Sequence, residues 1–304
     1  MKTKISAVIN TLNEESNLKD CLESLNFVDE IVLVDMHSTD KTREIAYQFT
    51  HNVFLHTKTE YVEPARNFAI SKATGNWILI VDADERVPKN LRAKLVEIAD
   101  EDQADFVRLP RKNLIFSQWI KYSRWWPDYN IRFFKKGKVE WQDAIHSIPV
   151  TFGKGVTLEA DEGLALEHHN YQTIDQFFDR AMRYARVEAK SLKADGYKFN
   201  PVDALVKPFS EFLSRFFAGE GYRDGFHGFV LSLLQAFQTF FIYLLIWQEQ
   251  GFKAEKAEKF IPLWLKLTQS KARELRFWQY ALRISQTPGK FERLVLKIWR
   301  KIGF

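Results

Sequence analysis

Two aspartates one residue apart, Asp82 and Asp84, follow the apolar run Trp77–Val81. Residues i and i+2 of a strand point to the same face, so we expect the two carboxylates to lie on one side of the sheet. Like charges this close repel unless a cation lies between them and a substrate's phosphates, as Mg²⁺ or Mn²⁺ commonly does. The motif therefore indicates a divalent-metal site, with a solvated turn as the alternative.

Further polar residues follow other apolar runs of the same region. Asn13 and Glu14 come after one run, Asp35 closes the next, and Arg66 stands early in an expected helix, where a cation could meet a diphosphate. Helix capping or an ordinary surface position explains each residue alone. Together, at the ends of successive strands, they predict a site for a nucleotide diphosphate.

The elements that position these residues alternate in a βα rhythm. We expect strands at 5–11, 31–35, 53–56, 77–81 and 106–109, and helices at 18–25, 39–49, 64–73 and 88–99. Short apolar strands separated by helices indicate a Rossmann-like α/β fold, in which a mainly parallel sheet carries helices on both faces. Such sheets bind ligands at the carboxyl ends of their strands.

The rest of the chain changes character twice. After residue 110 the pattern is irregular and rich in strands, with two clear ones at 131–134 and 164–168. From residue 173 onward we expect helices at 176–193, 203–217, 225–247, 254–277 and 290–302. The sequence therefore predicts a catalytic domain at 1–200 and a helical region at 201–304.

The composition excludes several classes of protein. The chain has 304 residues, a single cysteine, Cys21, and no glycine before Gly75. One cysteine excludes an intramolecular disulfide framework and a cysteine-cluster metal site, and it fits a reducing compartment. The missing glycines exclude a P-loop and a dinucleotide fingerprint in that stretch. The first residues lack the apolar segment of a secretory signal, so we expect a cytoplasmic protein.

Positive charge is concentrated at the C-terminal end. Residues 251–304 hold 13 Lys and Arg against four Asp and Glu, in a chain whose net charge is +5. This asymmetry argues against nucleic acid as a partner and for an anionic surface. Residues 290–302 combine one apolar stripe with basic side chains, which fits binding to anionic lipid. Ordinary packing on the domain is the alternative.

A second segment of interest, residues 229–247, has 19 residues without a charge, long enough to consider a membrane span. Its four polar side chains fall on about a third of the helical circumference. We therefore favour a helix that lies at the bilayer interface or is buried against a partner, such as a second copy in a homodimer. The expected location is peripheral, on the inner face of the cytoplasmic membrane.

Taken in order, four motifs identify a resemblance. Asn10–Glu15, Asp35–Thr42, Ala65–Asn67, and Thr74–Trp77 running into Asp82–Glu85 resemble glycosyltransferase family 2. The pattern is most similar to the branch with lipopolysaccharide-core β-1,4-glucosyltransferases. The resemblance implies a GT-A fold, a nucleotide-diphosphate sugar donor (usually UDP), a Mg²⁺ or Mn²⁺ ion, and inversion at the anomeric carbon. It fits a glycan or lipid-linked acceptor in cell-envelope synthesis.

The resemblance also assigns roles to individual residues. Those expected to hold the uracil and ribose are Thr11, Asn13, Glu14 and Asp35. Asp40 and Arg66 are expected to border the nucleotide, and Asp82 to face the ribose. Asp84 is expected to ligate the metal, and His168 to complete the metal–diphosphate site.

Inverting transfer also needs a base that takes the proton of the acceptor hydroxyl. We rank Asp128 first, Asp143 second and His146 third, all in the irregular region after the sheet. Relatives often show His-Glu where this chain has His146-Ser147, so the glutamate that one would nominate is absent.

Two other functions compete with this interpretation. A sugar nucleotidyltransferase would normally show a glycine-rich loop after the first strand, and residues 10–17 contain no glycine. A catalytically silent, membrane-attached carbohydrate-binding or scaffold protein fits the absent glutamate, but it does not explain why both aspartates and Arg66 are present. We therefore expect an enzyme.

Overall fold

The computed structural model describes residues 3–57, 63–141, 149–254 and 256–302. The protein folds into two compact units. The first unit consists of Met1–Trp119 and Trp125–Asn170. The second consists of Ile120–Arg124 and Tyr171–Phe304. Each unit is described by itself below. The helix that follows Tyr171 thus groups with the helical unit, and the functional division predicted at residue 200 stays a prediction.

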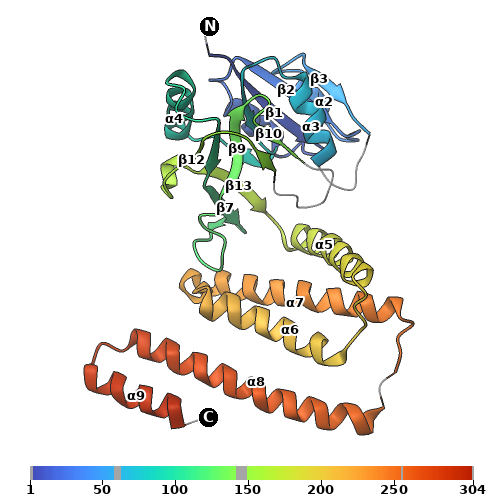
Figure 1. The fold of residues 1–304 in the computed structure, drawn as a ribbon, viewed down its shortest axis with the longest axis vertical. Coiled ribbons are helices and arrows are strands. Elements are labelled where there is room, and N and C mark those ends of the chain that lie inside the picture. The colour runs from blue at the N-terminus through green and yellow to red at the C-terminus, as the bar shows by residue number, and fades with distance from the viewer. Residues whose placement is uncertain (1–2, 58–62, 142–148, 255, 303–304) are drawn as a thin grey trace. The chain divides into compact units, whose positions relative to one another are not determined.

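A seven-stranded sheet forms the centre of the first unit, in the order β12-β6-β9-β4-β1-β2-β3 (Figure 1). Its neighbours pair in parallel, except that β9 lies antiparallel between β4 and β6. The strands are β1 (Ile5–Thr11), β2 (Glu30–Asp35), β3 (Val53–Leu55), β4 (Trp77–Ile80), β6 (Phe106–Leu109), β9 (Asn130–Lys135) and β12 (Gly155–Thr157). The sheet confirms the predicted mainly parallel α/β fold.

Alternation along the strands buries both faces of this sheet. Ala7 and Ile9 of β1 pack in one cluster with α1 (Leu18–Glu23), α2 (Thr42–Ala46) and α4 (Lys89–Asp100). Val8 packs in the other cluster, which Ala69 of α3 (Glu63–Lys72) covers. Because successive strand residues point to opposite faces, this period of two requires helices on both sides.

A smaller sheet, in the order β5-β13-β7-β8, borders the carboxyl end of β4. Its strands are β5 (Glu85–Arg86), β7 (Arg111–Ile115), β8 (Gln118–Trp119) and β13 (Leu166–Tyr171), and a separate pair joins β10 (Val139–Glu140) to β11 (Val150–Thr151). β5 pairs antiparallel with β13, which sets Glu85 opposite His168. This pairing brings the acidic turn before β5 next to a histidine more than 80 residues away in sequence.

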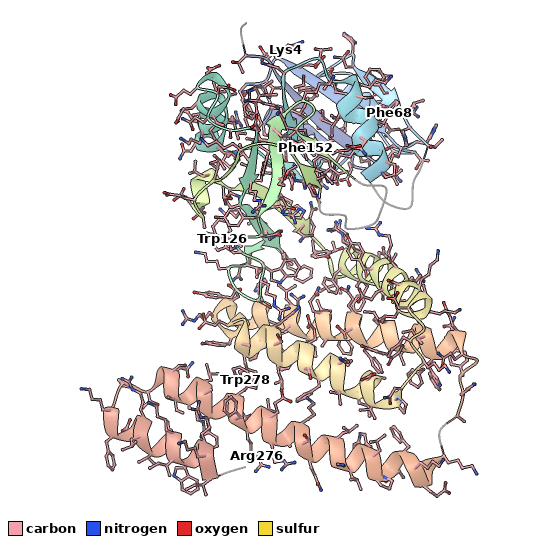
Figure 2. The ribbon with its side chains drawn as sticks, in the orientation of Figure 1. Lys4, Phe68, Trp126, Phe152, Arg276 and Trp278 are labelled. Atoms are coloured by element: carbon pink, nitrogen blue, oxygen red, sulfur yellow. The ribbon has the colours of Figure 1, made fainter. Side chains whose placement is uncertain are left out.

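The second unit contains the helices α5 (Ile174–Ala194), α6 (Pro201–Leu213), α7 (Gly225–Glu249), α8 (Ala257–Gln286) and α9 (Lys290–Ile302). Ala185 and Ala189 of α5 pack against Ile242 and Ile246 of α7. Trp278 of α8, labelled in Figure 2, stacks on Phe217 with ring centroids 5.8 Å apart. Small residues on α5 thus let α7 approach closely, and aromatic stacking ties α8 to the unit.

Residues 120–124 belong to this helical unit because their backbone is bound there. The carboxylate of Asp224, in the 3₁₀ turn Gly221–Asp224, accepts the N–H groups of Lys121 and Tyr122 at 3.1 and 2.9 Å. Ser123 N–H donates to the carbonyl of Gly219 at 2.7 Å. The loop is therefore held by hydrogen bonds to residues of the helical unit.

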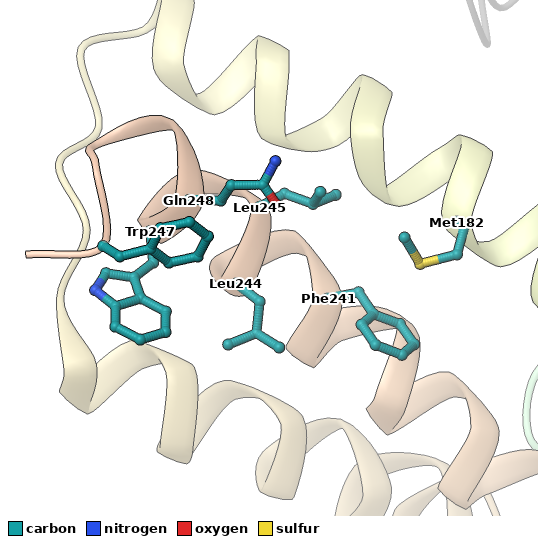
Figure 3. Close-up of a pocket in the computed structure, with 7 residues that line it drawn as sticks. Met182, Phe241, Leu244, Leu245, Trp247 and Gln248 are labelled. Carbon is teal, nitrogen blue, oxygen red and sulfur yellow. The ribbon is translucent and has the colours of Figure 1, made fainter.

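Figure 3 shows a pocket of about 250 Å³ in the helical unit, beside α5 and α7. Its lining residues are Met182, Phe241, Leu244, Leu245, Trp247, Gln248 and Phe252. None of these side chains is ionisable near neutral pH, so the lining offers no side chain that could act as an acid or a base.

Within the described part of the chain, the segment Gly221–Glu249 is the helix long and apolar enough to cross a membrane. Only a third of its most apolar window is buried inside the protein. The expectation that residues 229–247 lie at the bilayer interface or against a partner stays a prediction.

Several element boundaries differ from the sequence-based expectations. The helix expected at 39–49 begins at Thr42, because the preceding polar residues bond to a neighbouring loop instead. The strand expected at 77–81 ends at Ile80, and the Glu85 N–H closes a turn on the carbonyl of Asp82 at 2.8 Å. Asp82 and Asp84 therefore lie in a turn, and the expectation that they share a strand face was wrong.

Candidate active site

The carboxyl ends of β1 and β2 meet at Thr11 and Asp35, which are register partners. The Asp35 side chain is fully buried and accepts the Thr11 hydroxyl at 3.3 Å and the Ser38 N–H at 2.9 Å. Because a buried carboxylate is costly without such donors, these bonds fix the end of β2 and the start of its loop.

The loops after β1 and β2 are tied by hydrogen bonds from one to the other. Asn13 has a φ of 57°, a left-handed conformation that asparagine tolerates, and its side-chain oxygen accepts the Thr39 N–H at 2.8 Å. The Glu14 N–H donates to the Thr42 hydroxyl at 2.8 Å. The predicted nucleotide residues Thr11, Asn13, Glu14 and Asp35 are thus brought together at one edge of the sheet.

Asp40 belongs to the same set of ties. Its carboxylate accepts the Glu15 N–H at 3.1 Å and the Thr42 N–H at 3.0 Å. Slight burial raises the pKa of Asp40, but the bonds from Thr42 and Glu15 outweigh it and hold the pKa below its usual value. Asp40 therefore holds the loop that borders this edge.

Asp82 is surrounded by guanidinium groups. Arg66 of α3 lies 3.1 Å from one carboxylate oxygen, and Arg132 of β9 binds both oxygens. Burial raises the pKa of Asp82, but the charges of Arg132 and Arg66 outweigh it and hold the pKa well below its usual range. The Arg66–Asp82 contact places two predicted site residues side by side.

Glu85 connects this cluster to a third arginine, Arg111. Its side chain is fully buried, accepts the Asp82 N–H at 2.9 Å, and pairs with Arg132 at 3.1 Å and Arg111 at 3.4 Å. A buried carboxylate with two cationic partners and a backbone donor is well compensated. Glu85 therefore fixes the acidic turn to β7 and β9.

Asp84 faces His168 of β13, whose Nε2 lies 3.3 Å from the Asp84 Oδ2. The His168 Nδ1 lies 2.7 Å from the Asn113 side-chain oxygen, an acceptor, so Nδ1 carries a proton and donates. A protonated ring would form an ion pair with Asp84, whereas a ring that carries its proton only on Nδ1 turns the lone pair of Nε2 toward the carboxylate, where both groups could bind one cation. Two ligands of one ion lie roughly 3.0–3.3 Å apart, so this donor pair fits a divalent metal.

The protein supplies only part of such a metal's ligands. Across the described ranges, no cluster of three or more His, Cys, Asp or Glu side chains is placed to hold an ion. Mg²⁺ and Mn²⁺ are commonly bound by one or two protein groups together with substrate phosphates. Asp84 and His168 suit that arrangement, in which a diphosphate completes the coordination.

Asp128, which we ranked first as the base, is firmly bound. Arg111 contacts one of its oxygens through Nη2 at 2.7 Å and Nε at 2.8 Å, and the Asn113 amide donates to the same oxygen at 2.9 Å. Burial raises the pKa of Asp128, but Arg111 and Asn113 outweigh it and lower the pKa. A carboxylate of low proton affinity is a poor base. Asp143 and His146 lie outside the described residues.

The structure adds four residues that the sequence-based assignment missed: Glu85, Arg111, Asn113 and Arg132. Glu85 directly follows the acidic motif, which could have indicated it. The other three come from β7 and β9. Arg132 belongs to the weaker part of the family resemblance, with Trp126–Asp128, but was given no role, and nothing in the local sequence marks Arg111 and Asn113.

Comparison with known proteins now assigns the class. Residues 6–154 match the family model described as glycosyl transferase family 2. An uncharacterised glycosyltransferase of Rickettsia typhi is 31% identical over 248 residues, which cover 78% of this chain and 84% of that protein. The lipopolysaccharide core biosynthesis glycosyltransferase LpsC of Rhizobium meliloti is 26% identical over 262 residues, covering 83% of this chain and 95% of LpsC.

Solved structures give more distant matches. The structure of S. aureus TarS residues 1–349 in complex with UDP is 16% identical, covers 82% of this chain and 92% of that chain, and has a TM-score of 0.42.

The chain belongs to glycosyltransferase family 2. Its mainly parallel sheet with helices on both faces is the GT-A fold of that family, followed by a helical C-terminal region. It is therefore an enzyme that transfers a glycosyl group, and the nucleotidyltransferase and silent-scaffold alternatives are set aside.

Proposed function

We propose that this glycosyltransferase moves a hexose from a UDP-sugar to a glycan or lipid-linked acceptor of the cell envelope, with inversion at the anomeric carbon. A divalent cation, Mg²⁺ or Mn²⁺, assists the reaction. The observation that carries the proposal is the acidic turn: Asp82 pairs with two arginines, while Asp84 faces a histidine nitrogen. The relation to a lipopolysaccharide core enzyme supports an acceptor in lipopolysaccharide synthesis.

The donor's nucleoside is assigned to the tied loops after β1 and β2. Thr11, Asn13, Glu14 and Asp35 gather there, at the carboxyl edge where parallel sheets bind ligands. Asp40 contributes by holding the loop, because its carboxylate is already engaged by backbone N–H groups.

The diphosphate is assigned to the neighbourhood of Arg66 and the acidic turn. Arg66 supplies positive charge for the phosphates, and Arg132 fixes Asp82 so that its carboxylate can face the ribose. An ion held by Asp84 and His168 would neutralise charge that develops on the leaving diphosphate. The arginines around the turn offset the negative charge that the donor adds.

The acceptor hydroxyl needs a base on the side of the anomeric carbon that is opposite the leaving diphosphate. Because Arg111 and Asn113 stabilise the ionised form of Asp128, we propose that Asp128 organises this side of the site and does not take the proton. Asp143 and His146 are then the candidates for the base.

The metal assignment is tested with Asp84→Asn, which keeps the shape of the side chain and removes its charge. We expect glycosyl transfer to fall at least about 100-fold, because charge stabilisation of the leaving group is lost. Mn²⁺ titrated in the presence of UDP should bind more weakly, as followed by the electron paramagnetic resonance signal of free Mn²⁺.

Asp179→Asn is the matched control, because Asp179 is exposed on α5, in the helical unit. This variant should bind Mn²⁺ and transfer sugar as the wild type does. An Asp84→Asn enzyme with unchanged activity and metal affinity would refute the metal site.

We also propose that α9 attaches the enzyme to anionic lipid on the cytoplasmic face of the membrane. Five large apolar side chains of α9 are exposed, and Phe291 and Ile302 expose 78% and 72% of their surface. The other three are Leu294, Ile298 and Trp299. Basic side chains on the same helix favour an anionic layer over a neutral one. Nucleic acid is not expected as a partner, and a homodimer stays a prediction that sedimentation analysis would test.

A further inference from the structure

The buried side chain of Asn113 connects two parts of the site that lie far apart in sequence. It comes from the middle of β7 and is fully buried between His168 of β13 and Asp128, which precedes β9. A buried amide in the smaller sheet could serve packing alone. Its partners show a more specific arrangement.

The orientation of the Asn113 amide is fixed by the chemistry of its neighbours. The side-chain nitrogen donates to the Trp125 carbonyl at 2.8 Å and to the Asp128 carboxylate at 2.9 Å. Both partners can only accept a hydrogen bond. The Trp125 partner is a backbone carbonyl, and Asp128 is ionised because Arg111 pairs with it. A flipped amide would place its oxygen against two other oxygens, so the nitrogen must point this way.

The side-chain oxygen of Asn113 is therefore directed at His168. It lies 2.7 Å from the His168 Nδ1 and also accepts from the Asn170 amide at 3.4 Å. An oxygen that only accepts requires Nδ1 to be the protonated nitrogen of the ring. The other nitrogen, Nε2, is turned toward Asp84.

We propose that Asn113 is a positioning residue, which fixes the ring orientation and tautomer of His168 for metal binding. It also holds Asp128 in place, so one amide aligns the metal side of the site with the acceptor side. The inference rests on the proposed function, because it requires that Asp84 and His168 bind the cation. Partners of this kind, behind the metal ligands, commonly change metal affinity about 10- to 100-fold.

Two variants of Asn113 separate positioning from simple packing. Asn113→Leu keeps the volume and removes the acceptor for Nδ1, so the Kd for Mn²⁺ in the presence of UDP should rise at least about 10-fold. Asn113→Asp keeps an acceptor for Nδ1, so its Kd should stay within about threefold of the wild type. The readout is again the paramagnetic resonance signal of free Mn²⁺.

The melting temperatures of the two variants should follow a different order. Asn113→Asp buries a carboxylate beside Asp128 and loses the donated hydrogen bonds, so it should melt below Asn113→Leu. Asn113→Asp should thus bind Mn²⁺ more tightly than Asn113→Leu although it is less stable. If Asn113 served packing alone, metal affinity and stability would fall together. Equal metal affinities for both variants, or wild-type affinity for Asn113→Leu, would overturn the inference.

A measurement on the wild-type chain needs no substitution of Asn113. Nitrogen-15 NMR of the metal-free protein should show the His168 ring protonated at Nδ1, with the signal assigned from its disappearance in His168→Gln. A ring protonated at Nε2 alone would overturn the inference without touching the proposed reaction. Failure of the wild type to bind Mn²⁺ with UDP would instead remove the metal assignment itself.

Discussion

At the scale of single residues, arginines and acids alternate along a continuous series of ion pairs in the candidate site. Arg66, Asp82, Arg132, Glu85 and Arg111 follow one another through contacts of 3.4 Å or less, and Arg111 continues to Asp128. Each acid has at least one arginine partner, so each of these buried or half-buried carboxylates is compensated. Such pairing stabilises the ionised form of an acid, which suits holding a substrate more than transferring a proton.

Asp128→Asn tests this view through stability and activity together. The variant keeps the shape but loses the charge that Arg111 faces, so we expect a loss of about 2 kcal/mol in the free energy of unfolding at pH 7. Transfer should fall less than about 10-fold, since removal of a true base costs 10²–10⁴-fold. A larger loss of kcat, with donor binding unchanged, would restore Asp128 as the base.

The pH dependence of this stability difference has a definite sign. The folded-state pKa of Asp128 lies below the unfolded value of about 3.9. The ionised carboxylate therefore contributes stability above about pH 4, and this contribution is lost as the pH falls through the folded-state pKa. Urea unfolding should show the full difference between wild type and Asp128→Asn at pH 7 and a shrinking one below about pH 4.

At the scale of elements, the smaller sheet assembles the site. β5 starts one residue after Asp84, pairs with β13 and so sets the acidic turn beside His168, while β7 brings Asn113 and Arg111. The strand pattern that predicted β1 and β2 is local, because alternation and apolar runs are visible within a few residues. The pairing of β5 with β13 joins residues that no local pattern connects.

The same contrast explains which site residues were predictable. The aspartates of the acidic turn were found because they stand together after an apolar strand. Arg132 was not assigned to the site because its partner Asp82 is 50 residues away in sequence. Its charge alone does not distinguish it from an ordinary surface arginine. The same local view wrongly extended β4 past Ile80, since an apolar run does not reveal the turn that Glu85 closes.

Helix α9 gives the prediction that belongs to this scale. The double substitution Lys297→Glu with Lys301→Glu reverses two exposed charges on α9. Each lost cation near an anionic bilayer is worth about 1 kcal/mol, and the two new carboxylates are repelled, so binding to phosphatidylserine-containing vesicles should weaken at least about 30-fold. Vesicle co-sedimentation measures this affinity.

The matched control changes net charge by the same amount elsewhere. Lys190→Glu with Lys198→Glu alters two exposed lysines of the helical unit outside α9. This control should keep most of the vesicle affinity. Equal losses for the two double variants would mean that total charge, and not the face of α9, governs the attachment.

At the scale of the whole molecule, a GT-A unit and a helical unit are joined in one chain, and the chain passes between them more than once. Residues 120–124 leave the first unit, bind to the second and return before Trp125. The sequence predicted the two kinds of structure but not this excursion, because Asp224, which holds the loop, lies about 100 residues further on.

The choice of nucleotide donor can be measured through the stability of the whole folded enzyme. UDP with Mn²⁺ at about 100 times its Kd should stabilise the folded state by about 2.7 kcal/mol, since the ligand binds only the native chain. GDP with Mn²⁺ at the same concentration should give a smaller rise in melting temperature. Thermal-shift measurement compares the two, and an equal or larger rise with GDP would contradict the assignment of a uridine donor.

The antiparallel strand β9 has a consequence for how the protein is made. It lies between β4 and β6, although it follows both in the chain, so the two parts of the large sheet are joined only through residues 130–135. A nascent chain that has left the ribosome only as far as Tyr129 lacks the strand that joins β4 to β6, and it has no guanidinium from Arg132 for Asp82. Synthesis of one six-residue segment thus both joins β6 to β4 and completes the charge pairing around the acidic turn.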